Sequence, residues 1–145
     1  MNQYSNNKTI KTKMEEKKMK NVEFYICEVC GNIITYVENA GVPVHCCGRP
    51  MKKLTANTTD AAQEKHVPQV IVDGNKVHVN VGSVTHPMSA EHSITWVCIQ
   101  TSRGVKLNYL SHDGRPETCF TLCDGEKLIA TYAYCNLHGL WMAEA

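Results

Sequence analysis

Apolar and polar residues alternate in short runs along the second half of the chain. In the run Val77-His78-Val79-Asn80-Val81 the valines occupy one face and the polar residues the other, which is the pattern of a strand with one buried face. Turn sequences such as Asp73-Gly74-Asn75, typical of a hairpin, separate the runs. With no helical period visible, the pattern predicts an all-β protein built on an antiparallel β-sandwich. The predicted strands are 67–72, 76–81, 93–100, 105–110, 117–122 and 128–134.

The segment 22–55 has a different pattern. It carries one strand-like run at 33–37 and two cysteine pairs. A unit of about 35 residues cannot bury a sufficient core, so it needs a metal ion or a partner surface to fold. The predicted organisation is a disordered basic extension at 1–21, a small metal-bound domain at 22–55, a polar linker at 56–65 and a β-sandwich domain at 66–145.

Charge is unevenly distributed along the chain. Residues 1–20 contain six lysines and two glutamates, a local charge of +4, while the whole chain carries +1. A nucleic-acid reader should carry its basic residues as a stripe on the folded part, so nucleic acid is not expected as a partner. The chain shows neither a secretory signal nor a run of about 18 apolar residues, so no membrane partner is expected. A cytoplasmic location is the resulting prediction.

Eight cysteines and seven histidines are an unusual supply of metal-binding side chains. In the cytoplasm, cysteines bind metals or react more often than they form structural disulfides. Four cysteines form two close pairs, followed by Gly31 and Gly48, where a backbone that wraps an ion often needs a positive φ. Two such pairs predict a tetrahedral four-sulfur site for iron or zinc, with a structural zinc site or disulfides as alternatives. The four residues are Cys27, Cys30, Cys46 and Cys47.

Four histidines lie where loops or strand edges are expected, so their side chains are free to converge. Cys135-x-x-His138 has the spacing with which one turn presents two ligands. Four imidazoles and one thiolate exceed a closed tetrahedral zinc site and suit a five-coordinate iron with one open position. The predicted ligands are His66, His86, His92, Cys135 and His138, whereas His45, His78 and His112 are expected to be ordinary surface residues.

Three cysteines belong to neither set. Cys98 is expected to be a buried thiol that shares a strand face with Ile94 and Trp96. Cys119 and Cys123 are four residues apart on an extended strand, about 13 Å between their Cα atoms. That separation is too large for a disulfide without a sharp bend.

Several motifs resemble one known family. EKHVP at 64–68, GSVTHPMSAEHSITW at 82–96 and YCNLHGLW at 134–141 are similar to the superoxide reductases of the desulfoferrodoxin–neelaredoxin family. YICEVCG at 25–31 and CCGRPM at 46–51 resemble desulforedoxin, a small mononuclear iron protein with an adjacent second cysteine pair. The resemblance covers about residues 22–143 and is to the form with two iron centres. It implies a desulforedoxin-like domain followed by an immunoglobulin-like sandwich, four equatorial histidines and Cys135 as the axial ligand.

The resemblance also implies an activity, the one-electron reduction of superoxide to hydrogen peroxide. Glu64 would occupy the sixth position of the resting ferric centre, and Lys65 would attract the superoxide anion. Two mononuclear irons per chain are implied, with zinc an alternative in the four-cysteine site. A homodimer and a rubredoxin-type electron donor are the implied partners. A rubredoxin-like electron-transfer protein, a zinc-stabilised binding module and a superoxide dismutase remain as alternatives.

Overall fold

The computed structural model describes residues 20–145, so the predicted extension at 1–21 lies, except for its last two residues, outside the described part. The described chain consists of antiparallel strands and one single-turn helix, and no helix in it is long and apolar enough to span a membrane. The first strands are β1 (Phe24–Ile26), β2 (Ile33–Thr35), β3 (His45–Cys46), β4 (Arg49–Pro50) and β5 (Lys52–Lys53). The helix α2 (Gln63–His66) is followed by β6 (Pro68–Asp73), β7 (Lys76–Val81), β8 (Ile94–Thr101), β9 (Gly104–Tyr109), β10 (Glu117–Thr121), β11 (Leu128–Cys135) and β12 (Gly139–Glu144).

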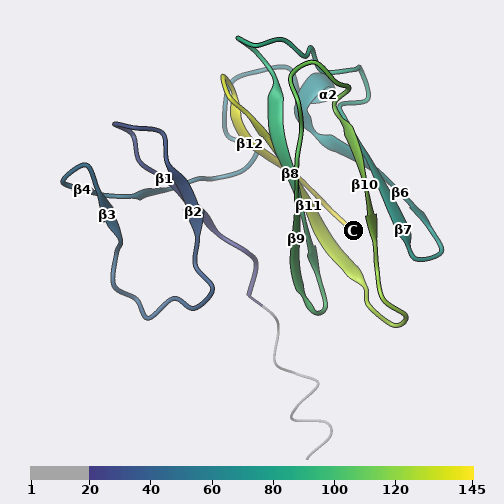
Figure 1. The fold of residues 1–145 in the computed structure, drawn as a ribbon, viewed down its shortest axis with the longest axis horizontal. Helices are drawn as coiled ribbons and strands as arrows, with labels where there is room; N and C mark the ends of the chain where they lie inside the picture. Colours follow the sequence, from purple (N-terminus) through teal and green to yellow (C-terminus); the bar gives the residue numbers. More distant parts are fainter. Residues whose placement is uncertain (1–19) are drawn as a thin grey trace, which may run out of the picture.

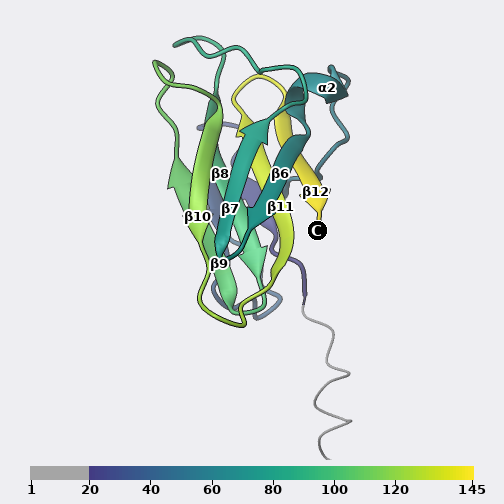
Figure 2. The same ribbon diagram turned by 90° about the vertical axis from the view of Figure 1, so that its right-hand side faces the viewer.

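Two sheets pack face to face in the C-terminal part of the chain (Figure 2). One sheet has the strand order β10-β7-β6 and the other β12-β11-β8-β9. The β6–β7 hairpin turns at Gly74, whose φ of 57° suits glycine. Val77, Val79 and Val81 point into the core between the sheets and are at most 1% exposed, while His78 faces solvent. The predicted all-β antiparallel sandwich is confirmed.

In the first segment the sequence pattern predicted only β2, and from residue 56 onward it missed two elements, β12 and α2. On β12, Leu140 and Trp141 are adjacent and both buried, because both faces of this strand are covered. A strand covered on both faces shows no alternation of apolar and polar residues. The helix α2 lasts a single turn, which is too short to show a helical period and too short to be stable without tertiary contacts.

The prediction that Ile94, Trp96 and Cys98 share one strand face is wrong for Ile94. Trp96 and Cys98 point to the outer face of the four-stranded sheet, whereas Ile94 points into the core between the sheets. The pairing of β8 with β11 shifts register between Trp96 and Ile94, which is the effect of a β-bulge. An extra residue in one strand reverses the face of every position beyond it. Cys98 is buried, as predicted.

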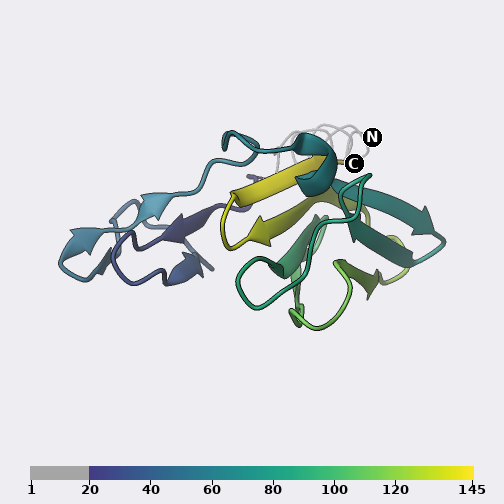
Figure 3. The same ribbon diagram turned by 90° about the horizontal axis from the view of Figure 1, so that it is seen from above.

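The first segment covers the outer face of this four-stranded sheet. Its sheet, of order β2-β1-β5, presents Phe24, whose ring centroid lies 4.8 Å from that of Trp96 and 5.6 Å from that of Tyr132. Together with Cys98 and Leu140, these residues belong to a second core. Figure 1 shows the segment beside the sandwich, and Figure 3 shows the same arrangement from above. The segment thus obtains from the sandwich the buried surface that it is too small to supply itself.

Candidate metal centres

The two cysteine pairs of the first segment converge. Their four sulfur atoms lie within 4.8 Å of one another, and the Sγ atoms of Cys30 and Cys46 are 3.6 Å apart. The first turn is closed by the amide N–H of Cys30, which donates to the Sγ of Cys27 at 3.5 Å. Gly31 and Gly48 have φ of 82° and 73°, so the positive φ expected after each pair is present. We call the set Cys27, Cys30, Cys46 and Cys47 the cysteine centre.

In the cysteine centre the pKa values of Cys27 and Cys47 are shifted in opposite directions. The amide N–H of Cys30 lowers the pKa of Cys27 to about 6, because it stabilises the thiolate. The neighbouring sulfur of Cys30 is the main cause that raises the pKa of Cys47 to about 12. A bound cation removes this conflict, because it stabilises all the thiolates together. All eight cysteines lie in the described part of the chain, and each is free of disulfides.

The predicted histidine ligands also converge, although they come from four separate places in the chain. Neighbouring rings are 4.7–5.0 Å apart between centroids and meet nearly at right angles, at 76–88°. The four contacts close a ring in the order His66, His86, His92, His138 and back to His66. One ring nitrogen of each histidine and the sulfur of Cys135 lie within 4.8 Å of one another. We call these five residues the histidine centre.

Hydrogen bonds determine which nitrogen of two rings faces this centre. Nδ1 of His66 is 2.6 Å from the carbonyl oxygen of Ala62, and Nδ1 of His86 is 2.6 Å from that of Pro87. A ring that donates its proton to a carbonyl through Nδ1 leaves Nε2 as a lone-pair donor. The two Nε2 atoms are 3.3 Å apart, so both face the centre.

The other two histidines complete the donor set. Nε2 of His92 is buried and has no hydrogen-bond partner among the described residues, an arrangement that is unfavourable unless another group binds it. Nδ1 of His138 lies 3.1 Å from Nε2 of His66 and 3.8 Å from Sγ of Cys135, so this ring presents the opposite nitrogen. Four imidazole nitrogens and one sulfur fit a transition metal such as iron, which supplies the partner that His92 lacks.

Burial prepares these residues to bind a cation. Desolvation lowers the pKa of His86 to about 4 and also lowers the pKa of His66 and His92, so all three are neutral near pH 7. Neutral imidazole is the form that ligates a metal. Burial raises the pKa of the Cys135 thiol, which is fully buried, and a bound cation offsets this by favouring the thiolate.

A loop after β7 holds the short helix that carries His66. Gly82 has a φ of 84°, and a Cβ atom at this position would collide with the carbonyl oxygen of Val84 in the same loop and would lie 2.7 Å from that of Lys65 and 2.8 Å from that of Glu64. The amide N–H of Val84 donates to the Glu64 oxygen at 2.8 Å. The close approach explains the glycine, which the sequence motif contained but whose role it did not reveal.

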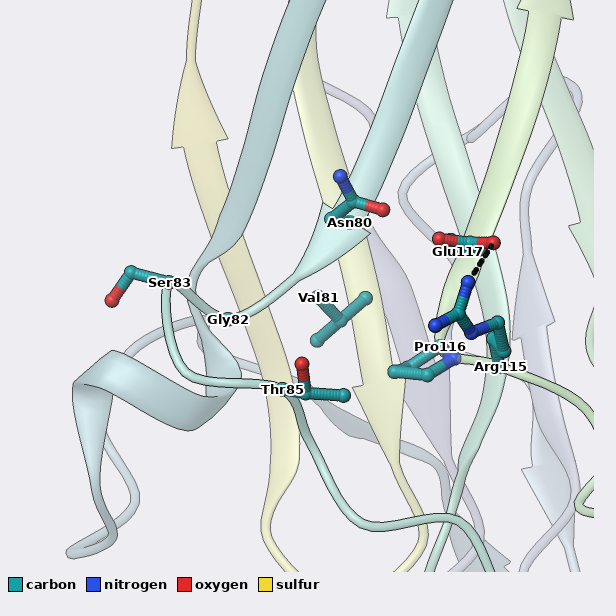
Figure 4. Close-up of a pocket in the computed structure, with 8 residues that line it drawn as sticks. All are labelled: Asn80, Val81, Gly82, Ser83, Thr85, Arg115, Pro116 and Glu117. Carbon is teal, nitrogen blue, oxygen red and sulfur yellow. Dashed lines mark ion pairs between the residues drawn. The ribbon is translucent and has the colours of Figure 1, made fainter.

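The same loop borders a pocket of about 270 Å³ (Figure 4). Arg115 and Glu117 form an ion pair of 3.7 Å at its rim, and Ser83 and Thr85 come from the loop itself. The lining residues include no member of either centre. The pocket is therefore separate from both donor sets.

Asn136 is a site residue that the sequence analysis missed. Its side chain accepts a hydrogen bond from the amide N–H of Ser93 at 2.9 Å and donates one to the carbonyl oxygen of Glu91 at 2.9 Å. These two residues flank His92, so Asn136 ties the His92 loop to the turn between Cys135 and His138. The available signal was an asparagine between two ligands, because asparagine side chains commonly bond backbone groups in turns.

The remaining predicted site residues lie at the edge of the histidine centre or outside it. Glu64 and Lys65 are exposed on α2, next to His66. Their charges act on the centre, since Lys65 contributes to the lowered pKa of His92 and Glu64 opposes the lowering of the pKa of His66. His45, His78 and His112 are exposed and belong to neither centre, as expected.

Comparisons with known proteins match the two parts of the chain that carry the donor sets. The model of the desulfoferrodoxin family matches residues 58–144, and that of the desulfoferrodoxin N-terminal domain matches residues 19–54. The desulfoferrodoxin of Syntrophotalea carbinolica is 42% identical over 123 residues, which cover 85% of this chain and 96% of the relative. The desulfoferrodoxin of Nitratidesulfovibrio vulgaris is 41% identical with the same coverage.

A solved structure has the same fold over most of the chain. The superoxide reductase from Treponema pallidum superposes with a TM-score of 0.74 at 38% identity, covering 86% of this chain and all of that one. The matches in sequence and structure both extend across the cysteine centre and the histidine centre. With these matches, the all-β fold and the two donor sets, the chain belongs to the desulfoferrodoxin family.

Proposed function

We propose that this protein is a superoxide reductase with two mononuclear iron centres. The observation that carries the proposal is the closed ring of four imidazoles with a fully buried thiol beside it. The five residues of the histidine centre would hold iron, which would supply one-electron redox chemistry to a small anion. The reaction adds one electron and two protons to superoxide and yields hydrogen peroxide, so an external reductant must supply the electron. The relatives named superoxide reductase support the same reaction.

The burial of the ligands supports access from one side only. His66, His86 and Cys135 are at most 3% exposed, whereas His92 and His138 are half-buried. His66, His86 and Cys135 therefore form the side of the centre that is closed to water. The two half-buried rings leave an approach for superoxide and for the protons that the product requires. Cys135 would hold the iron through its thiolate, which would donate electron density to the metal.

Two measurements test the proposed reaction. Protein purified without added metal should contain about two irons per chain and show two distinct thiolate absorption bands, because the two centres offer different donors. Added superoxide should give hydrogen peroxide without oxygen when a reductant is present. Zinc alone would contradict the proposal in favour of a binding module. Equal yields of peroxide and oxygen without reductant would indicate a dismutase.

Lys65 serves as the local cation that attracts superoxide. It is exposed next to His66, and within residues 20–145 it takes part in no ion pair. Lys65→Met should slow the encounter with superoxide about 10-fold and flatten its dependence on ionic strength, since screening acts on this charge. Pulse radiolysis at several salt concentrations measures both effects. Lys76→Met is the control, because Lys76 begins β7 and lies about 16 Å along the strand from Val81 at its other end. Equal encounter rates in the unaltered protein and in both variants would contradict the role of Lys65.

In this proposal Glu64 would be a further ligand of the metal in the oxidised, resting protein. Its backbone is held by the loop after β7, while its side chain is exposed and free to turn toward the centre. Glu64→Ala should therefore change the absorption spectrum of the oxidised protein. The reduced protein, in which the Glu64 carboxylate would have to leave room for superoxide, should keep its spectrum.

The partners and location are part of the same proposal. Cys30 and Cys47 are exposed, as is Val29 beside them, which favours docking of a small rubredoxin-type electron donor at the cysteine centre. The edge strand β9 exposes Val105, Leu107 and Tyr109, which favours a homodimer that sedimentation equilibrium can measure. Eight free thiols favour a reducing cytoplasm.

The division of the chain into a domain at 22–55, a linker at 56–65 and a domain at 66–145 also remains part of the proposal. The two family models, which meet between residues 54 and 58, support it. The second core, to which both parts contribute, indicates that the domains fold together. Iron is proposed for the cysteine centre, and metal analysis distinguishes it from zinc.

A further inference from the structure

Trp141 lies against the histidine centre without belonging to it. It is one of two tryptophans, lies on β12 three residues after His138, and is only 1% exposed. A tryptophan packed this closely among ligands contacts them with both its ring face and its N–H group. Each contact reaches a different histidine.

The first contact sets the plane of the His66 ring. The indole and imidazole are stacked, with centroids 4.8 Å apart and planes at 28°. The two histidines that neighbour His66, in contrast, meet it edge-on at 76° and 88°. Since α2 is a single turn, its backbone gives the ring little support. The orientation of His66 thus depends on the Trp141 stack and on the hydrogen bond to Ala62.

The second contact holds the His138 backbone. The indole N–H donates to the carbonyl oxygen of His138 at 3.1 Å. Nδ1 of His138 is in turn 3.1 Å from Nε2 of His66, although the two residues are 72 positions apart in the chain. One side chain therefore joins the helix that carries the first ligand to the turn that carries the last two, Cys135 and His138.

We propose that Trp141 is a positioning residue that fixes His66 relative to the turn of Cys135 and His138 and so preorganises the histidine centre. The proposal rests on the proposed function, because it takes the histidine centre to be a metal site. Trp141 acts through the ligands and does not touch the substrate. Removing a group that orients a metal ligand without binding the metal typically lowers the metal affinity 10–100-fold.

Two variants separate the contacts. Trp141→Phe keeps a flat ring against His66 but removes the N–H donor, and Trp141→Leu removes both. The dissociation constant of the histidine centre for Co(II), measured against a competing chelator, should rise about 10-fold in the first and about 100-fold in the second. Both variants should also change the Co(II) absorption spectrum of this centre. The two centres are distinguishable in this spectrum, because one offers four nitrogens and one sulfur and the other offers four sulfurs.

Trp96→Phe is the matched control. Trp96 is the other tryptophan, is 9% exposed, and stacks on Tyr134 in the second core, away from every ligand of the histidine centre. This variant should lose thermal stability but keep the Co(II) affinity and spectrum. Trp141 is then its only tryptophan, and its fluorescence should change when the histidine centre fills.

The outcomes distinguish the two proposals. If the unaltered protein binds no metal at the histidine centre, the proposed function fails. If it binds metal and the Trp141 variants show the same affinity and spectrum, only the positioning role is overturned. Should Trp141→Leu fail to fold, Trp141→Phe decides alone: a 10-fold weaker site supports the role, and an unchanged site overturns it.

Discussion

Replacing Cys135 by serine is expected to abolish the thiolate-to-iron absorption of the histidine centre and to lower its iron affinity at least about 100-fold. The reason is that Cys135 supplies the only sulfur of this centre and is fully buried, so no other thiolate can reach the ion. Superoxide reduction should fall with the loss of bound iron. Visible absorption, iron analysis and peroxide yield of the purified variant measure the three effects.

Cys98→Ser provides the matched control for this change. Cys98 is 2% exposed and lies in the second core, so its replacement also introduces a hydroxyl into a buried position. The control should lose stability by about 1–3 kcal/mol and keep both iron bands. A sulfur-to-iron band that persists at the histidine centre of Cys135→Ser would reject the assignment of Cys135 as a ligand.

Gly82→Ala should destabilise the protein by about 3 kcal/mol and weaken metal binding at the histidine centre together. A positive φ disfavours any residue with a Cβ by about 1–2 kcal/mol. The added Cβ would also collide with the carbonyl oxygens of Val84, Lys65 and Glu64, and overpacking of this kind costs about 1–3 kcal/mol more. Relief of the collision moves α2 and with it His66. Urea unfolding and Co(II) titration measure the two effects.

Gly125 offers a control that isolates the backbone contribution. Its φ of 80° nearly equals the 84° of Gly82, but nothing lies within 4 Å of the Cβ that alanine would add. Gly125→Ala should therefore lose only about 1 kcal/mol and leave the metal affinity unchanged. Equal stability losses in the two variants would show that the approach of α2 to Gly82 is unimportant.

The sequence predicted those strands that have one buried face and one face in water. The valines of β7 alternate with polar residues because one face of that strand is buried and the other is in water. Leu140 and Trp141 on β12 gave no such signal, since both faces are covered. The orientation of Ile94 depended on a bulge in the pairing with β11, and a bulge is a property of two strands rather than of one.

The same distinction applies to the histidine centre. Its five ligands were recognisable in the sequence because their residue types and spacing carry the chemistry themselves. Asn136 and Trp141 act through contacts with backbone and rings that are distant in the chain, and Gly82 acts by leaving space for α2. No local pattern records such contacts, so these residues were found only in the folded chain.

The sequence by itself determined the all-β class, the family and the candidate ligand residues, because alternation, motif spacing and side-chain chemistry are local properties. Only the tertiary structure decided which nitrogen of each histidine faces the centre, which of the five residues are fully buried and how α2 is held. Those features depend on the packing of segments as far apart as His66 and His138, where hydrogen bonds, burial and close backbone approach select one arrangement.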